Sequence, residues 1–252
     1  MDTISAVIIT RDEAHNLPRC LSSVKWCREI VVVDTGSTDE TREIAWEAGA
    51  TVYEITWEGY GPAKRFAVDK ATSSWVLSLD ADEECPPELR DEICDILNHE
   101  TSYNGYYVPR LTSFLGSPIR HCGWYPNRVL RLFRRECGNF TDAAVHEKAE
   151  VTPPIGNLKA DLHHYSFPTL EHYLEKSNKY TTLGAEEAFR SGRRATLLDL
   201  IIRPPWSFIS HYLFRRGFLD GSEGFLVSLL SATAVLTKYS KLRFLQRQKE
   251  NR

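Results

Sequence analysis

Several features that would define the class of this protein at once are missing from its sequence. No apolar stretch comes near the roughly 20 residues that a membrane-spanning helix needs. The longest, 225–236, is short and contains Ser and Thr. The chain starts on a strand-like run with no basic segment before it. We therefore expect neither a signal peptide nor a segment that crosses a bilayer.

Net charge and paired cysteines are scarce as well. A formal net charge of −3 over 252 residues argues against a protein dedicated to nucleic acid. The six cysteines are scattered and form no CxxC pair, which is typical of reduced, mostly structural thiols in a cytoplasmic protein. The 42% of hydrophobic and 26% of charged residues are ordinary for a soluble globular protein.

The small net charge conceals an uneven distribution. From residue 203 to the end, nine basic residues face three acidic ones, so this tail carries about +6 and the remainder about −9. The tail is also rich in aromatic residues. Basic helices with an apolar face bind anionic membrane surfaces, so the tail could make peripheral contact with a membrane. The alternative is a helical subdomain packed on the body or across a homodimer interface.

The first hundred residues alternate strand and helix patterns. Runs rich in Val and Ile predict strands at 5–10, 29–34, 51–56 and 75–79. Helical patterns lie between and after them, at 16–24, 37–48, 61–71 and 87–98. The second of these helices is expected to start at a capping box formed by Ser37 and Glu40. Strands separated by helices imply right-handed βαβ units and a parallel sheet.

The pattern changes after residue 100. Further strands are expected at 106–111 and 129–133, then a helix at 169–190 and helices broken at Pro204-Pro205 and around 217–224. The predicted fold class is α/β: a mixed, mainly parallel sheet flanked by helices, with a C-terminal helical extension. We expect a catalytic domain over 1–168 and a helical region over 169–252.

Three polar clusters follow predicted strands, at 10–13, 34–39 and 80–84. In open α/β sheets ligands bind beyond the carboxyl ends of the strands, where these clusters would meet. In the third, Asp80 and Asp82 flank one small residue, and both carboxylates can face one point of a cleft. Carboxylate oxygens suit Mg²⁺ or Mn²⁺, which often binds one or two carboxylates plus substrate phosphates. The alternative is a solvated acidic turn before the next helix.

The same segments resemble a known family. VIITRDE at 7–13, VDTGSTD at 33–39 and DAD at 80–82 are similar to the opening strand, nucleotide-binding turn and DxD motif of family-2 glycosyltransferases of the GT-A fold. Together with 57–65 and 143–147, they most resemble lipopolysaccharide core β-1,4-glucosyltransferase-like enzymes. The resemblance covers nearly the whole chain and implies a Rossmann-like GT-A domain.

The resemblance also implies roles for individual residues. Asp82 would bind the metal, with Asp80 beside it and nearer the ribose and donor sugar. His164 would complete the metal site or contact the diphosphate, although two packed histidines at a strand end are an alternative for His163 and His164. The residues expected at the nucleotide-sugar donor are Thr10, Arg11, Glu13, Asp34, Lys64 and Arg65.

Two positions rest on weaker patterns. Alternation along 129–133 separates Arg131 from its apolar neighbours, and arginine binds phosphate bidentately, so Arg131 could hold the diphosphate or a phosphorylated acceptor. The acceptor hydroxyl needs a proton acceptor. The family's usual Glu-Asp pair is absent, so we assign the role to Glu147, then His146 or Asp142, with Asp161 open. A surface salt-bridge pair is the alternative.

These patterns favour a metal-dependent glycosyltransferase over two alternatives. A nucleotidyltransferase would carry an N-terminal Gly-rich basic loop, and 6–19 contains no glycine. A non-catalytic glycan- or nucleotide-binding module would have no use for the carboxylates. The family resemblance implies inversion, a UDP-sugar such as UDP-glucose as donor, and a glycan or glycolipid acceptor such as lipopolysaccharide core. The expected location is the cytoplasm, at the inner face of the cell membrane if the tail binds lipid.

Overall fold

The computed structural model describes residues 3–141 and 148–250. The chain forms two compact units. The first comprises Met1–Arg110 and Asn127–His164, and the second comprises Leu111–Pro126 and Tyr165–Arg252. The segment 111–126, expected in a catalytic domain over 1–168, thus belongs to the same compact unit as the C-terminal helices.

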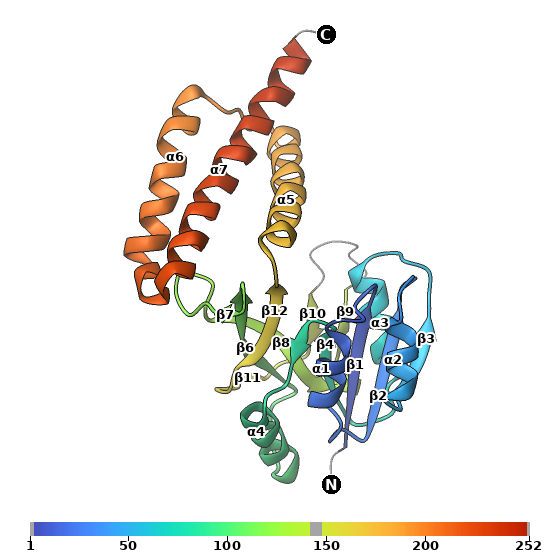
Figure 1. The fold of residues 1–252 in the computed structure, drawn as a ribbon. Helices are drawn as coiled ribbons and strands as arrows, with labels where there is room; N and C mark the ends of the chain where they lie inside the picture. Colours follow the sequence, from blue (N-terminus) through green and yellow to red (C-terminus); the bar gives the residue numbers. More distant parts are fainter. Residues whose placement is uncertain (1–2, 142–147, 251–252) are drawn as a thin grey trace. The chain divides into compact units, whose positions relative to one another are not determined.

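Four parallel strands form one end of the sheet in the first unit (Figure 1). They are β1 (Ile4–Thr10), β2 (Glu29–Asp34), β3 (Thr51–Glu54) and β4 (Trp75–Asp80), in the order β3-β2-β1-β4. Next to β4 the sheet continues with β8 (Asn127–Arg134), β6 (Gly105–Phe114), β12 (Leu162–Phe167) and β5 (Glu83–Glu84). The pairs β4–β8, β8–β6 and β12–β5 are antiparallel. All the strands predicted before residue 134 are present.

Helices cover both faces of the parallel strands, because alternate residues along each strand point to opposite faces. Ile4, Ala6 and Ile8 share one cluster with α1 (Leu17–Ser23), α2 (Thr41–Glu47) and α4 (Pro87–Asn98). Val7 and Ile9 share the other cluster with α3 (Tyr60–Lys70). Every residue of β1 is buried, which explains its continuous apolar run. The predicted GT-A class, a mixed sheet flanked by helices with C-terminal helices, is confirmed.

Short elements complete the sheet region. β7 (Ser117–Pro118) pairs antiparallel with β6, and β11 (Ile155–Asn157) pairs parallel with it. A separate ribbon consists of β9 (Gly138–Phe140) and β10 (Ala149–Val151), with the 3₁₀ turn η1 (Arg135–Cys137) before it.

The predicted capping box at Ser37 is wrong. Helix α2 begins at Thr41, and its N-cap residue Glu40 makes no side-chain capping bond. The Ser37 hydroxyl instead donates to the Asp34 carboxylate and accepts from the Asp12 backbone N–H at 2.9 Å. The Ser37 side chain thus hydrogen-bonds to Asp34 and Asp12 and does not cap the helix as its spacing from Glu40 predicted.

The second unit contains three long helices (Figure 1). They are α5 (Leu170–Arg190), α6 (Leu197–Ile209) and α7 (Gly221–Glu250), with the π turn η2 (Ser210–Phe214) and the 3₁₀ turn η3 (Gly217–Asp220) between α6 and α7. Thr169 caps α5, and Thr196 with Asp199 forms a capping box on α6. Helix α7 packs against both α5 and α6.

The predicted break at Pro204-Pro205 is also wrong. Helix α6 continues through both prolines, although each lacks the N–H that a helix interior uses. Aromatic contacts beyond the prolines, such as Phe208 against Phe225 of α7, hold the helix in place. The chain turns instead near Arg216, whose φ of 56° lies in the left-handed region, and the predicted interruption around 217–224 is confirmed.

One helical segment of the described chain, residues 217–249, which comprises η3 and nearly all of α7, is long and apolar enough to cross a membrane by length and composition. Its most apolar 18 residues are mostly not buried, since only 22% of that stretch lies inside the structure. No uninterrupted apolar run marks this segment in the sequence, because small and hydroxyl residues stand among its Leu, Val and Phe residues.

Candidate active site

The carboxyl ends of three adjacent strands bring the predicted polar clusters together. Thr10 of β1 pairs with Asp34 of β2, and Ile9 of β1 pairs with Asp80 of β4. Residues 10–13, 34–39 and 80–84 therefore leave the sheet at the same edge, where open α/β sheets bind their ligands. The candidate site is built on this edge, within the first unit.

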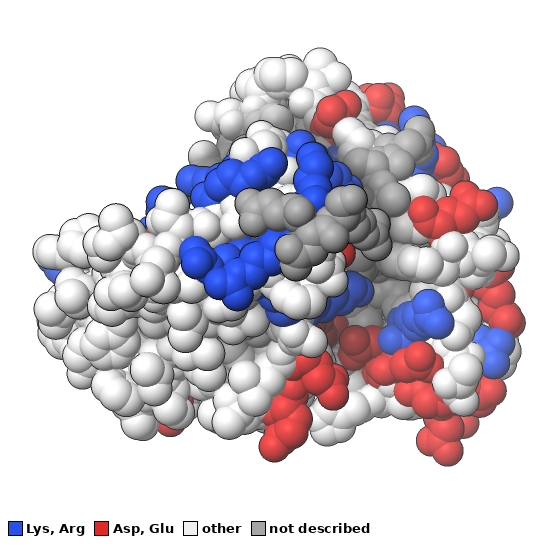
Figure 2. Space-filling view, turned by 90° about the horizontal axis from the view of Figure 1, so that it is seen from above, with Lys and Arg blue, Asp and Glu red and all other residues white. Residues whose placement is uncertain are grey.

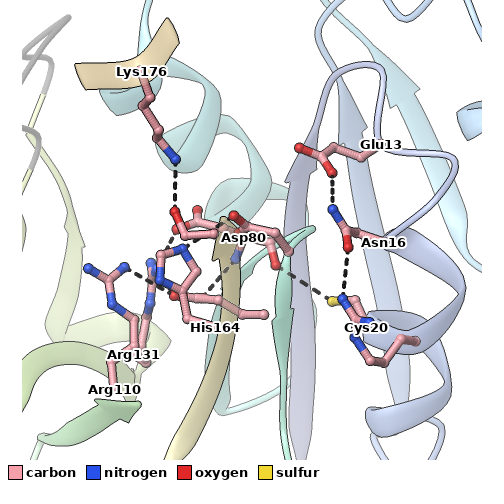
Figure 3. A network of polar contacts seen from close by, with 12 residues as sticks. Glu13, Asn16, Cys20, Asp80, Arg110, Arg131, His164 and Lys176 are labelled. Atoms are coloured by element: carbon pink, nitrogen blue, oxygen red, sulfur yellow. Dashed lines mark hydrogen bonds and ion pairs between the residues drawn. The ribbon is translucent and has the colours of Figure 1, made fainter. Parts of the chain in front are cut away.

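Two buried cations hold the Asp80 carboxylate. Lys64 Nζ of α3 lies 3.0 Å from one oxygen, and the Arg131 guanidinium of β8 contacts the other. Lys64 and Arg131 are both almost fully buried, whereas Asp80 remains partly open to solvent. Figure 3 shows Arg131 directed from its strand toward Asp80. The simple alternation predicted over 129–133 is wrong at this point, because the β8–β6 pairing is irregular there: Leu132 pairs with Tyr106 and Leu130 with the next residue, Tyr107.

Glu83 lies beneath this pair and is completely buried. Its carboxylate accepts from the Asp80 backbone N–H at 3.0 Å and from Arg131 at 2.7 Å. Arg110 of β6 contacts the same carboxylate at 3.3 Å (Figure 3). Two carboxylates and three cations thus form one network that fixes the turn after β4.

The network controls the charge of Asp80. Burial alone would raise the pKa of this carboxyl, but the positive charges of Arg131 and Lys64 outweigh it and hold the pKa well below its usual range. Burial lowers the pKa of Arg131, and the negative charges of Asp80 and Glu83 raise it above its usual value. Asp80 is therefore an anion at any physiological pH.

Asp82 points to a different partner. Its Oδ2 lies 3.2 Å from Nε2 of His164, and both side chains are largely buried. The antiparallel pairing of β5 with β12 sets this geometry, because His164 stands opposite Glu83 in the register. The neighbouring His163 lies 4.0 Å from Glu84 instead. The structure thus brings together one carboxylate of the DxD motif and the histidine that the family resemblance selected.

Asp82 and His164 offer two adjacent metal donors. Mg²⁺ and Mn²⁺ bind through few protein ligands when phosphates and water supply the others. Among residues 3–141 and 148–250, no group of three or more His, Cys, Asp or Glu side chains is placed to hold a metal. Both Asp80 oxygens already contact cations. The residues present therefore fit a cation shared with a ligand's phosphates, held on Asp82 and His164.

Two carboxylates, Asp34 at the end of β2 and Asp12 in the loop after β1, hold the turn after β2. Asp34, which is 1% exposed, accepts from the backbone N–H groups of Gly36 and Ser37 at 3.1 and 3.0 Å. The Asp12 carboxylate accepts from the Thr38 N–H at 2.7 Å. The loop after β1 and the turn after β2 are thereby joined into one rigid wall of the site.

The remaining predicted donor residues lie at this wall or near it. The Thr10 hydroxyl is buried and has no hydrogen-bond partner within the described part of the chain. Glu13 accepts from the Asn16 amide at 2.8 Å (Figure 3), and its N–H donates to the Thr41 hydroxyl. Arg11 and Arg65 are exposed, so Arg65 points away from its helical neighbour Lys64. A buried hydroxyl at the end of β1 is suited to a ligand's polar group.

Two residues of the network were not predicted as site residues. Glu83 was expected only as part of the acidic cluster 80–84, and Arg110 only as part of the strand at 106–111. A charged residue between apolar neighbours in a strand was the available signal for Arg110. The proposed proton acceptors Glu147, His146 and Asp142 lie outside the described residues. Asp161, the open alternative, is half-buried just before β12.

An open α/β sheet with polar clusters at the carboxyl ends of its strands is an arrangement that binds ligands, and comparisons with known proteins identify the family. Residues 5–117 match the family Glycosyl transferase family 2. An uncharacterized glycosyltransferase of Rickettsia prowazekii (strain Madrid E) is 32% identical over 263 residues, covering 100% of this chain and 90% of the relative. The chain belongs to glycosyltransferase family 2.

A second relative carries a more specific name. The lipopolysaccharide core biosynthesis glycosyltransferase LpsC of Rhizobium meliloti (strain 1021) is 32% identical over 248 residues, covering 95% of this chain and 91% of the relative. Among solved structures, a glucosyl-3-phosphoglycerate synthase from Mycobacterium tuberculosis with Mn²⁺, UDP and phosphoglyceric acid has a TM-score of 0.49 at 17% identity. That match covers 77% of this chain and 80% of the synthase.

Proposed function

We propose that this family-2 glycosyltransferase moves glucose from UDP-glucose, with inversion, onto a hydroxyl of a glycan or glycolipid such as lipopolysaccharide core. The single observation that carries the proposal is that the two carboxylates of the DxD motif have different partners. Asp80 is held as an anion by Lys64 and Arg131, while Asp82 faces His164. The name of the LpsC relative supports the choice of acceptor.

The proposed roles follow from these contacts. Asp80, partly open and fixed in charge, accepts hydrogen bonds from the ribose or the donor sugar. Asp82 and His164 hold Mg²⁺ or Mn²⁺, which when bound supplies positive charge to the departing diphosphate. Thr10 offers its unpartnered hydroxyl to the nucleotide. The wall made by 10–13 and 34–39 keeps these groups in position before the donor arrives.

Four further residues remain proposed at the donor site: Arg11, Glu13, Asp34 and Arg65. Because the Asp34 carboxylate already accepts hydrogen bonds from three groups of its own turn, we propose that it shapes the nucleotide pocket. The proton of the acceptor hydroxyl passes to Glu147 or His146, which remain proposals.

The proposed acceptor also implies a location. A glycolipid substrate requires the enzyme to work at a membrane, so we propose a cytoplasmic protein in peripheral contact with the inner face. The basic tail supplies the charge for an anionic surface. A homodimer built on the same region is the alternative.

A panel of nucleotide sugars tests the function. A donor that binds the folded protein raises its melting temperature by mass action. We expect UDP-glucose with Mn²⁺ to raise it, EDTA to abolish the rise, and slow release of UDP into water to accompany it. A response to nucleoside triphosphates with sugar phosphates, and none to any nucleotide sugar, would contradict the proposal.

A further inference from the structure

Helix α6 exposes a continuous apolar face. Its large side chains recur every three or four residues, so they share one side of the helix. Each is more than one-third exposed, and Leu198 and Trp206 reach 64% and 60%. This α6 face consists of Leu198, Ile201, Ile202, Trp206 and Ile209, and Leu213 of the adjoining turn η2 extends it.

The opposite side of α6 is already occupied. Ser207 is buried against the rest of the unit, and Phe208 contacts Tyr212 and Phe225. Helix α7 contacts α6 there and also contacts α5. Within the described part of this unit the α6 face stays largely uncovered, and even Trp206, which contacts the Phe214 ring at 5.8 Å, is 60% exposed. Contiguous exposed apolar surface of this kind marks an interaction site.

Basic residues flank the α6 face at both ends. Arg193 and Arg194 precede the helix, and Arg215 and Arg216 follow it; all four are exposed. The one acidic residue on the helix, Asp199, is paired with Arg203. Figure 2, seen from above, shows a largely uncharged area on its left side, with basic side chains gathered beside it.

This charge pattern decides between two occupants. A second copy packed by a two-fold axis would present the same patch, so it would bring arginine pairs and their excess positive charge together. An anionic lipid leaflet would instead offer negative headgroups at the ends of the helix and hydrocarbon along its face. Arginine stems can extend from an apolar zone to headgroups, and Trp206 is a residue type enriched at such interfaces.

We propose that α6 lies in the plane of an anionic membrane, with the α6 face inserted among the acyl chains and the flanking arginines at the headgroups. The contact is mainly hydrophobic, so it differs from docking by the basic tail alone. It rests on the proposed function only in that a lipid-linked acceptor would explain its use.

Vesicle flotation with the full chain tests this inference. We expect binding to phosphatidylcholine vesicles that contain phosphatidylglycerol, weaker binding to phosphatidylcholine alone, and substantial retention at high salt, because salt screens charge but not apolar burial. Ile202→Glu and Trp206→Glu should each reduce binding at least about tenfold, as expected when one large apolar side chain is lost from the lipid.

The matched control is Trp46→Glu, which changes a tryptophan that is 51% exposed on α2 in the first unit and should leave binding unchanged. A paired Arg215→Gln, Arg216→Gln variant should lose the preference for anionic lipid while keeping salt-resistant binding. Circular dichroism checks that each variant is folded.

Three results would overturn the inference. The first is no vesicle binding by the wild-type chain, and the second is equal binding by Ile202→Glu. The third is a wild-type dimer that Ile202→Glu converts to a monomer without any lipid dependence, because the second copy would then be the occupant. None of these measurements uses a sugar, so the proposed transferase activity is tested separately, by donor binding; only the proposed membrane location is shared by both tests.

Discussion

Asp82 Oδ2 lies 3.2 Å from His164 Nε2, although one residue follows β4 and the other belongs to β12. Asp80, two positions earlier, is held by Lys64 and Arg131 instead. The two carboxylates of one short motif therefore have separate partners. We propose Asp82 as the metal ligand because its partner, His164, can also bind a metal: imidazole and carboxylate groups both coordinate divalent cations.

Removing either member of this pair should weaken metal-dependent donor binding. We expect Asp82→Ala and His164→Ala each to weaken UDP binding in the presence of Mn²⁺ at least about tenfold, in the range seen when groups supporting a metal site are lost. Isothermal titration with and without Mn²⁺ measures the effect. His163→Ala is the matched control, because His163 lies beside Glu84 and away from Asp82. Full Mn²⁺-dependent binding by Asp82→Ala would contradict the assignment.

The buried network should dominate the stability of the first unit. Arg131→Met leaves the buried Glu83 with Arg110 as its remaining cation and removes one of two cations from Asp80. Breaking a buried ion pair typically costs about 3–5 kcal/mol, and we expect that loss in urea denaturation. Arg90→Met, which removes an exposed pair with Asp91, should change the free energy of unfolding by less than about 0.5 kcal/mol. Similar values for the two variants would show that the network adds little.

Acid should expose the contribution of Asp80. Its pKa is lowered in the folded state, because Arg131 and Lys64 outweigh the effect of burial. A lowered folded pKa adds stability above the unfolded pKa, which is about 3.9 for Asp, and this stability is lost as pH falls toward the folded value. Below about pH 4 the wild-type free energy of unfolding should therefore fall more steeply than that of Asp80→Asn. Parallel curves would contradict the charge assignment; exposed Asp91→Asn is the control.

Thr10 separates a binding role from a structural one. Thr10→Val should leave the free energy of unfolding within about 0.5 kcal/mol of the wild-type value or raise it, because the hydroxyl forms no hydrogen bond with the described residues. Donor affinity should nevertheless fall. The matched control is Thr35→Val, whose hydroxyl donates to the Thr10 carbonyl at 3.1 Å and should cost about 1 kcal/mol. Unchanged donor affinity in Thr10→Val would remove Thr10 from the nucleotide site.

Glu147 is the proposed proton acceptor. Glu147→Gln should lower turnover by roughly 10²–10⁴-fold, the usual effect of losing such a group, while donor affinity hardly changes. Single-turnover rates with saturating donor measure the step. Normal turnover would move the role to His146, Asp142 or Asp161, and each is tested by the same substitution to a neutral side chain.

The sequence by itself determined the parallel strands, the helices between them and the edge at which the site lies. These features depend on local periodicity, since a strand buried on both faces reads as an apolar run and a polar cluster marks its end. The positions of Thr10, Asp34 and Asp80 at neighbouring strand ends followed from that pattern.

Only the tertiary structure decided which groups meet at that edge. Partners such as Arg110 and His164 come from distant segments, so sequence spacing could not show that Asp80 binds cations and Asp82 faces a histidine. The same holds for the continuous helix at Pro204-Pro205, where packing against α7 outweighs the local cost of proline. The α6 face became visible only when that helix was whole, because an apolar stripe exists only once its residues share one side.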